Sequence, residues 1–245
     1  MNSGMYAALS GNLNMLEKLN VVANNLANAN TVGFKKDRVY FERVLDSVNN
    51  PTPGSQNGAD APIQSLVRTF TDFSNGPIKQ TGGTFHVAID GDGFFAVNTP
   101  EGVAYTRQGN FQRDKNGKLT TIEGYEVRGK GGGSLTVAGG KVNIDSGGNI
   151  FVDGEMTASL EVVDFPKPYQ LQKIGKAMFL PTDPQVVPQP VQKPSVIQGH
   201  LEDSNVSAIA EMTQVIESSR SFESCQRAVR SYDDMSAKAI ELGRL

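Results

Sequence analysis

The side chains that most often carry out nucleophilic or metal chemistry are scarce in this sequence. It holds one cysteine, Cys225, and two histidines, His86 and His200, which lie far from the cysteine along the chain. Nucleophilic catalysis needs a serine or cysteine beside a base, but no G-x-S-x-G turn is present, and Cys225 falls on a helical apolar stripe. A lone cysteine with such distant histidines makes neither a disulfide nor a Cys/His zinc site. We therefore predict no catalytic residue, no metal ligand and no enzymatic activity, although a glycosidase-like pair of carboxylates brought together by the fold stays open.

Two motifs with ligand-binding composition lack the order that binding requires. Asp90-Gly91-Asp92-Gly93 begins like a calcium loop, but the spaced ligands and the bidentate glutamate of an EF-hand do not follow. The run Gly129-Lys130-Gly131-Gly132-Gly133-Ser134 resembles a phosphate loop in composition but has neither the G-x-x-x-x-G-K-[ST] order nor a helix after it. We interpret the two motifs as a tight turn and a loose hairpin, and predict no cofactor.

The charge and hydropathy of the chain exclude several classes of protein. Its 245 residues carry 23 basic and 26 acidic side chains, a net charge of −3, which argues against nucleic-acid binding. No apolar run approaches the roughly 18 residues of a membrane helix, so no membrane span is predicted. The first 34 residues hold only the charges Glu17 and Lys18, and asparagines interrupt their apolar residues. If the protein leaves the cytoplasm, we expect export without a cleaved signal peptide.

Apolar residues recur at helical spacing at both ends of the chain. At the N-terminal end the period predicts a helix over 3–29 with a coiled-coil-like seam, in which Asn12 fills one position and fixes register. A second helix is predicted over 205–242. At 1.5 Å per residue the helices would measure roughly 40 and 55 Å, too long to bury a whole stripe on a β domain of this size. We expect the two helices to pair with each other and with other chains, the alternative being cap helices on one globule.

Between the helices the pattern changes twice. Residues 35–48 predict a second short helix, and the Pro- and Gly-rich residues 49–62 an extended linker. From 63 to 200 apolar residues alternate and turn signals intervene, which predicts an antiparallel β domain. Five prolines within 181–194 indicate a polyproline-like strap. The predicted fold is therefore α+β, with segments 1–34 (core helix), 35–62 (short helix and linker), 63–180 (β domain), 181–204 (strap) and 205–245 (core helix).

Several short motifs, in a fixed order, resemble the bacterial flagellar rod and hook protein family. They run from Ser10-Gly11 to the C-terminal helix, so the resemblance covers the whole chain apart from linkers. In chain order they are Ser10-Gly11; the run from Asn24 to Lys35 (NNLANANTVGFK); the run from Val87 to Phe95 (VAIDGDGFF); the run from Tyr105 to Phe111 (YTRQGNF); Gly124-Tyr125; the run from Leu201 to Val206 (LEDSNV); and Glu211-Met212-Thr213.

The resemblance implies a structural subunit of the flagellar basal body. Family members are exported unfolded through the flagellum-specific type III apparatus and polymerise into a tube across the periplasm, with terminal helices inside. The implied partners are copies of the chain, other rod proteins and the export apparatus, with no nucleic acid and no small-molecule substrate. The short β domain and the stretch Gly132-Gly133-Ser134-Leu135-Thr136-Val137 favour a proximal-rod member, and a distal-rod member is the runner-up. A hook protein would need an inserted domain for which this length leaves no room.

Two sets of site residues follow from this reading. The expected subunit-interface residues are Leu9, Asn12, Leu16, Leu19, Ala23, Leu26, Met212, Ile216, Phe222, Val229 and Tyr232. The family-motif residues are Asn25, Leu26, Ala27, Asn28, Gly33, Phe34, Gly93, Phe94, Phe95, Ser204, Asn205 and Val206. Two functions of other classes remain as rivals: a soluble carbohydrate-active or ligand-binding β module, and a secreted adhesin or effector with coiled-coil ends.

Overall fold

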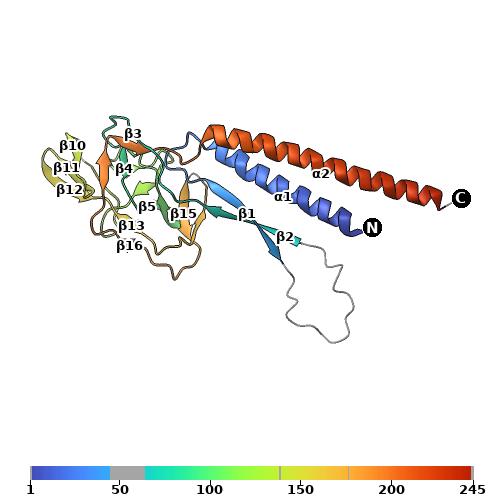
Figure 1. Ribbon diagram of the computed structural model, residues 1–245. Helices are drawn as coiled ribbons and strands as arrows, with labels where there is room; N and C mark the ends of the chain where they lie inside the picture. Colours follow the sequence, from blue (N-terminus) through green and yellow to red (C-terminus); the bar gives the residue numbers. More distant parts are fainter. Residues whose placement is uncertain (1, 45–63, 138, 176, 244–245) are drawn as a thin grey trace. The chain divides into compact units, whose positions relative to one another are not determined.

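The computed structural model describes residues 2–44, 64–137, 139–175 and 177–243 of the chain (Figure 1). Within these ranges two long helices lie at the ends of the sequence and antiparallel strands fill the middle, so the predicted α+β class is confirmed. Helix α1 spans Asn2–Ala27 and α2 spans Ala208–Leu242, close to the two helices predicted from apolar periodicity. Among the described residues, no helix combines the length and the apolar character needed to cross a membrane.

The chain divides into two compact units. Unit 1 comprises Met1–Ala27, Lys36–Asp72 and Ser207–Leu245, and unit 2 comprises Asn28–Lys35 and Phe73–Val206. Unit 2 thus takes in the Pro-rich segment and a short piece that follows the first helix, whereas sequence patterns had grouped these separately. The expected linker at 49–62 lies outside the described residues.

Unit 1 contains the two helices and a two-stranded ribbon. Strand β1 (Asp37–Val44) pairs antiparallel with β2 (Gln64–Thr71), with Asp37 opposite Thr71 and Val44 opposite Gln64. The short helix predicted over 35–48 is therefore wrong in its described part, where Asp37–Val44 is a strand. Val39 is half-buried between the exposed Arg38 and Tyr40, which is the two-residue period of a strand, and β-branched and aromatic residues favour that conformation. Two strands alone are marginally stable, and both strands of this ribbon contact α1.

Unit 2 is built from short antiparallel strands. Its largest sheet runs in the order β14-β15-β6-β5-β9-β8-β7, with β13 beside β5 and β16 beside β13; β10-β11-β12 form a second sheet, and β17-β4 and β18-β3 are separate pairs. The strands are β3 (Ile78–Gln80), β4 (Val87–Ile89), β5 (Phe94–Thr99), β6 (Gly102–Thr106), β7 (Gln112–Arg113), β8 (Leu119–Thr120), β9 (Glu126–Val127), β10 (Val142–Ile144), β11 (Asn149–Val152), β12 (Glu155–Ser159), β13 (Val162–Asp164), β14 (Leu171–Lys173), β15 (Met178–Pro181), β16 (Gln189–Pro190), β17 (Val196–Gln198) and β18 (His200–Glu202).

The core of unit 2 is divided by strand β5. Successive side chains of a strand point to opposite faces. Phe95 and Val97 accordingly join one buried cluster, in which Phe95 meets Phe111 edge-on at 5.2 Å between ring centroids. Phe94 and Ala96 join a second, largely aromatic cluster. The Phe94-Phe95 pair is therefore buried on both sides of the sheet.

The Pro-rich segment is part of the sheet rather than an isolated polyproline strap. In β16, Pro190 lies opposite Val163 and Gln189 opposite Asp164, and the Val191 N–H donates to the Val162 carbonyl at 3.0 Å. Residues 181–194 were expected to form an extended polyproline-like strap, and within this segment Gln189–Pro190 forms an edge strand of the sheet. Proline is tolerated in this position because β16 is an edge strand with one neighbour, so the missing N–H breaks no second ladder.

Candidate subunit interface

Helices α1 and α2 lie side by side in opposite directions (Figure 1). Two contacts define their register. The Asn25 Nδ2 lies 3.3 Å from Glu211 Oε2, and a Cβ placed on Gly11 would lie 3.9 Å from the Cys225 Sγ. Both pairs of residue numbers add up to 236, as an antiparallel register requires. The 14 residues between the contacts on each helix correspond to about 21 Å of shared length.

One face of each helix is turned toward the other. Val22 of α1 and Ser218 of α2 are buried, and the larger side chains of this seam are half-buried. From the predicted interface set these half-buried residues are Asn12, Leu19, Leu26, Phe222 and Val229. The Asn12 Oδ1 atom is buried without a hydrogen-bond partner among the described atoms. Part of the predicted interface is thus already partly covered within the single chain.

A second group of large apolar side chains is exposed on the helices. Leu9, Leu13 and Leu16 of α1 are 39% to 59% exposed, and Ile209, Met212 and Ile216 of α2 are 53% to 81% exposed. We call these six residues the apolar face. From the predicted interface set, Ala23 and Tyr232 are also exposed. Leu13 and Ile209 were not in the predicted interface set, although Leu9, Leu13 and Leu16 follow an i, i+4, i+7 spacing that could have revealed the first.

The six residues share one side of the helix pair. Successive residues are about 100° apart around an α-helix, so each group of three residues spans only about 60° of its helix circumference. On each helix, the centre of the group lies about 135° around the helix axis from the direction of the partner helix. The rotation from partner to group has the same sense on both helices. Because the helices are antiparallel, the two displacements bring both stripes to the same side. Residues Lys18, Val21 and Asn25, which face β1, lie on the other side of α1. The apolar face is therefore left uncovered by the ribbon of unit 1.

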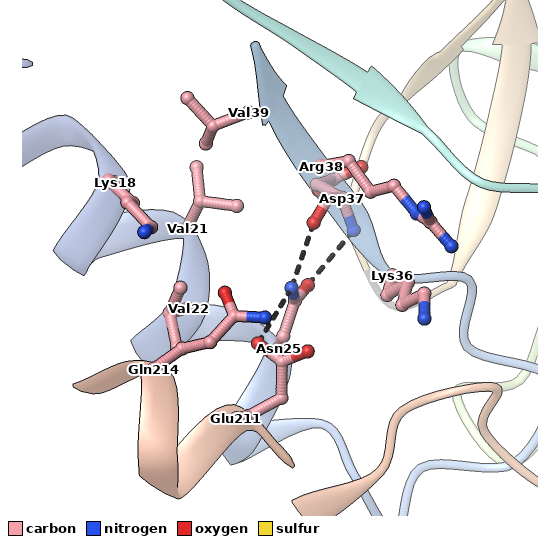
Figure 2. A pocket seen from close by; sticks show the side chains of 10 residues that line it. All are labelled: Lys18, Val21, Val22, Asn25, Lys36, Asp37, Arg38, Val39, Glu211 and Gln214. Carbon is pink, nitrogen blue, oxygen red and sulfur yellow. Dashed lines mark hydrogen bonds between the residues drawn. The ribbon is translucent and has the colours of Figure 1, made fainter. Parts of the chain in front are cut away.

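Figure 2 shows a polar cavity on the side of the helices that carries the ribbon. The Asn25 Nδ2 donates to the Asp37 carbonyl at 2.8 Å, and the Asp37 N–H donates to the Asn25 Oδ1 at 2.9 Å. The side-chain amide thereby satisfies both backbone groups of Asp37 on the edge of β1, as a neighbouring strand would. The cavity holds about 300 Å³ and is lined by Lys18, Val21, Val22, Asn25, Lys36, Asp37, Arg38, Val39, Glu211 and Gln214. Its polar contacts fasten the ribbon to α1 and explain why an asparagine stands at position 25.

Unit 2 contains a buried group of three charges, which we call the ion cluster: Lys35, Arg107 and Glu202. The Lys35 Nζ lies 2.6 Å from Glu202 Oε1, and both side chains are 1% exposed. The Arg107 Nη1 lies 3.1 Å from Glu202 Oε2. The carboxylate is therefore held by a different cation on each oxygen.

Two cations share one carboxylate, and backbone carbonyls complete their coordination. Lys35 Nζ also donates to the Ser74 carbonyl at 2.8 Å. Arg107 donates to the Ile89 carbonyl at 3.2 Å and to the Gly91 carbonyl at 2.6 Å. Buried charges are costly unless they are paired and hydrogen-bonded. Here each cation contacts the carboxylate and at least one backbone carbonyl, and the three charges sum to +1. The Arg107 Nε, by contrast, is buried without a partner among the described atoms.

The family motifs converge on this ion cluster. Gly33 has a φ of 66°, and a Cβ there would lie 2.5 Å from the Arg107 carbonyl carbon, so only glycine fits. Its N–H donates to the Glu202 carbonyl at 2.7 Å. Phe34 lies under the Lys173 ammonium, 4.2 Å from the ring centroid, and Phe94 lies 5.4 Å from the Arg107 guanidinium carbon. The sequence reading quoted these motifs but did not identify the charged residues that join them.

The residues with apparent catalytic or ligand-binding character have other surroundings. Asp92, in the calcium-like turn, forms an ion pair with Lys167 at 2.7 Å, with both side chains 57% exposed. His86 Nδ1 shares a hydrogen bond with the Thr81 hydroxyl at 2.8 Å, and Cys225 faces Gly11 in the helix seam. Gly132, in the phosphate-like run, lies beside the side chain of Arg128. These contacts describe turns and packing rather than a nucleophile beside a base.

The architecture defines the class of the protein: an α+β chain whose terminal helices pair and present an uncovered apolar face. Three protein-family models match it, namely "Flagella basal body rod protein" over residues 5–35, "Flagellar hook protein FlgE/F/G D1 domain" over 88–159 and "Flagellar basal body rod FlgEFG protein C-terminal" over 197–242. Each model contains one member of the ion cluster.

Curated relatives match over nearly the full length. The flagellar basal-body rod protein FlgF of Rhizobium meliloti is 34% identical and that of Mesorhizobium japonicum 30% identical, each match covering 98% of both chains. The flagellar basal-body rod protein FlgG of Bacillus subtilis is 32% identical, with 100% of both chains covered. The chain belongs to the family of flagellar basal-body rod proteins.

Proposed function

We propose that the protein is a structural, non-enzymatic subunit of the bacterial flagellar rod, which assembles with copies of itself and with other rod proteins through the apolar face of its helix pair. The observation that most strongly supports this proposal is the group of six exposed apolar side chains on one side of α1 and α2. Large apolar side chains exposed together on one side of a helix pair favour an interaction surface, because large exposed apolar patches mark interaction sites in soluble proteins.

The energetics support assembly through this face. Fully burying a Leu, Ile or Met side chain contributes about 1.5–3 kcal/mol. Six such residues in every subunit offer a driving force that recurs along a polymer. Close-packed interfaces resist shear, which suits a shaft that transmits torque. We further propose that the half-buried seam of α1 and α2 packs in the manner of a coiled coil, with Asn12 as its polar position.

More specifically, we propose that the protein is a proximal-rod subunit, as FlgF is. The alternative is a distal-rod subunit, as FlgG is. The modest length and the stretch from Gly132 to Val137 support the first. The curated relatives carry either name at similar identity, 30% to 34% for two FlgF proteins and 32% for one FlgG. The proposed location is the basal body, reached through the flagellar export apparatus. A ligand-binding β module is not favoured, because the full-length relatives are rod proteins.

Deleting the gene from its source bacterium tests the proposal. We expect the deletion strain to lack complete rods in electron micrographs of purified basal bodies and to lose swimming, and a plasmid copy to restore both. The point at which assembly stops separates the two positions, because loss of a proximal subunit leaves a shorter rod than loss of a distal one. Complete basal bodies and normal swimming without the gene would rule the function out.

A further inference from the structure

The backbone passes between the two compact units four times, after Ala27, Lys35, Asp72 and Val206. On the side of unit 2 these passages begin or end in three short segments: 28–35, which contributes two passages, 73–76 and 202–206. We call them the anchor segments. Although they are far apart in sequence, hydrogen bonds join all three to one another within unit 2.

Each anchor segment is bonded to both of the others. The Gly33 N–H donates to the Glu202 carbonyl at 2.7 Å, and the Gly76 N–H donates to Glu202 Oε1 at 2.9 Å. Lys35 Nζ and Asn205 Nδ2 both donate to the Ser74 carbonyl, at 2.8 and 3.1 Å. The backbones also approach closely, since a Cβ on Gly76 would lie 2.0 Å from the Asp203 carbonyl oxygen.

The ion cluster lies at the centre of these bonds. Lys35 comes from the first anchor segment and Glu202 from the third, and Glu202 also accepts from the second segment through Gly76. Arg107, which belongs to none of them, connects Glu202 to the carbonyls of Ile89 and Gly91 near the core of unit 2. Removing Glu202 would leave two buried cations without a counter-ion, and removing either cation takes away one of the buried hydrogen bonds that reach this carboxylate.

We propose that Lys35, Arg107 and Glu202 act as positioning residues that tie the four chain passages into a single cooperative anchor, so that the three anchor segments open together rather than one at a time. A load that enters unit 2 through any one passage is then shared by all. This mechanical consequence rests on the proposed function as a rod subunit, whereas the cooperative opening does not.

Amide hydrogen exchange on the full-length chain in solution tests the proposal. Each anchor segment carries one backbone N–H bonded to another anchor segment: Gly33, Gly76 and Asn205, the last donating to the Phe34 carbonyl at 3.3 Å. Neither the Arg107 side chain nor the Lys35 ammonium bonds to these three N–H groups. We expect Arg107→Met and Lys35→Met each to accelerate exchange at all three amides by a common factor, roughly tenfold to a hundredfold, because each removes charge-assisted hydrogen bonds to the buried carboxylate.

The controls separate cooperative opening from general loosening. The Leu119 N–H, which donates to the Leu135 carbonyl at 2.8 Å, should keep its exchange rate. Lys167→Met removes an exposed ion pair of similar length and should change none of the four amides. If Arg107→Met fails to fold, Lys35→Met decides the question, because it keeps the hydrogen bonds from Arg107 to the carbonyls of Ile89 and Gly91. Acceleration confined to one reporter amide, or no acceleration, would overturn the proposal. Since the measurement uses unassembled chain, its outcome is independent of whether the protein forms rods.

Discussion

Lys35 Nζ lies 2.6 Å from Glu202 Oε1, although 167 residues separate the two along the chain. The contact joins the end of the N-terminal motif to the start of the C-terminal one, and Arg107 adds the central motif on the second carboxylate oxygen. A buried ion pair is weak evidence for stability by itself, but breaking one is strongly destabilising. The arrangement gives three motifs that are widely separated in the sequence one shared contact in the fold.

The net charge that remains in the ion cluster predicts which of two substitutions destabilises the fold more. Glu202→Gln leaves two buried cations without a counter-ion, and we expect it to lower the free energy of unfolding by about 3–5 kcal/mol. Lys35→Met leaves Arg107 and Glu202 as a neutral pair, so its loss should be smaller. Urea unfolding followed by circular dichroism measures both values. A larger loss for Lys35→Met than for Glu202→Gln would contradict this account of the cluster.

Gly33→Ala tests whether the N-terminal motif needs glycine for packing as well as for backbone conformation. Gly33 and Gly82 have φ values of 66° and 71°, but a Cβ on Gly82 meets nothing within 4 Å, whereas one on Gly33 meets the Arg107 and Gln108 backbone at 2.5 Å. Gly82→Ala is therefore a matched control that should cost about 1–2 kcal/mol for left-handed backbone alone. We expect Gly33→Ala to cost more than Gly82→Ala by several kcal/mol, as for backbone overlap in a filled site. Equal losses in thermal or urea unfolding would show that the contact with Arg107 relaxes freely.

The helices and the antiparallel strands were predictable because each follows a local period of apolar residues. The helix predicted over 35–48 rests on an apolar spacing that fits both periods over so short a length, and in the described part Asp37–Val44 forms a strand because it pairs with Gln64–Thr71. The ion cluster could not be predicted from local sequence patterns. Arg107 and Glu202 lie 95 residues apart, and no pattern in either motif indicates that the two side chains are in contact. The helix faces were predicted only in part, because a single seam was expected, whereas Phe222 and Val229 turn inward and Met212 and Ile216 outward.

Tyr169 predicts how stability responds to alkaline pH. Burial of the phenol, and its hydrogen bond to Asp164 at 3.0 Å, raise the pKa of Tyr169 above its ordinary value. A group whose pKa is raised in the folded state stabilises the fold fully below its unfolded pKa, about 10 for tyrosine, and this contribution is lost as the pH rises toward the folded value. We expect the stability advantage of the wild type over Tyr169→Phe to be constant below about pH 10 and to shrink above it. Burial also raises the pKa of Tyr105, which both proteins retain, so only the difference between them reports on Tyr169. Urea unfolding across this range measures that difference, and an advantage that grows with pH would contradict the assignment.

Leu13 of the apolar face separates assembly from folding. Its side chain is 59% exposed, so Leu13→Asp removes little buried surface from the isolated subunit and should leave its unfolding midpoint nearly unchanged. In an assembly that covers this face, the same carboxylate would be buried without a partner in every subunit, at a cost of several kcal/mol each. We therefore expect Leu13→Asp, and likewise Ile216→Asp, to abolish rod formation and swimming.

Leu19→Asp should block assembly too, but because Leu19 is half-buried between the helices it should also loosen the helix pair itself, while leaving the melting of unit 2 unchanged. Glu17→Gln, a change at an exposed charged position on the same helix, should be tolerated because it removes at most a screened surface interaction. Electron micrographs of basal bodies, swimming assays and thermal unfolding of the purified variants give the three readouts. Normal swimming by both Leu13→Asp and Ile216→Asp strains would show that the apolar face is not the assembly surface, and a collapse of their unfolding midpoints would show that the face belongs to the fold of the single chain.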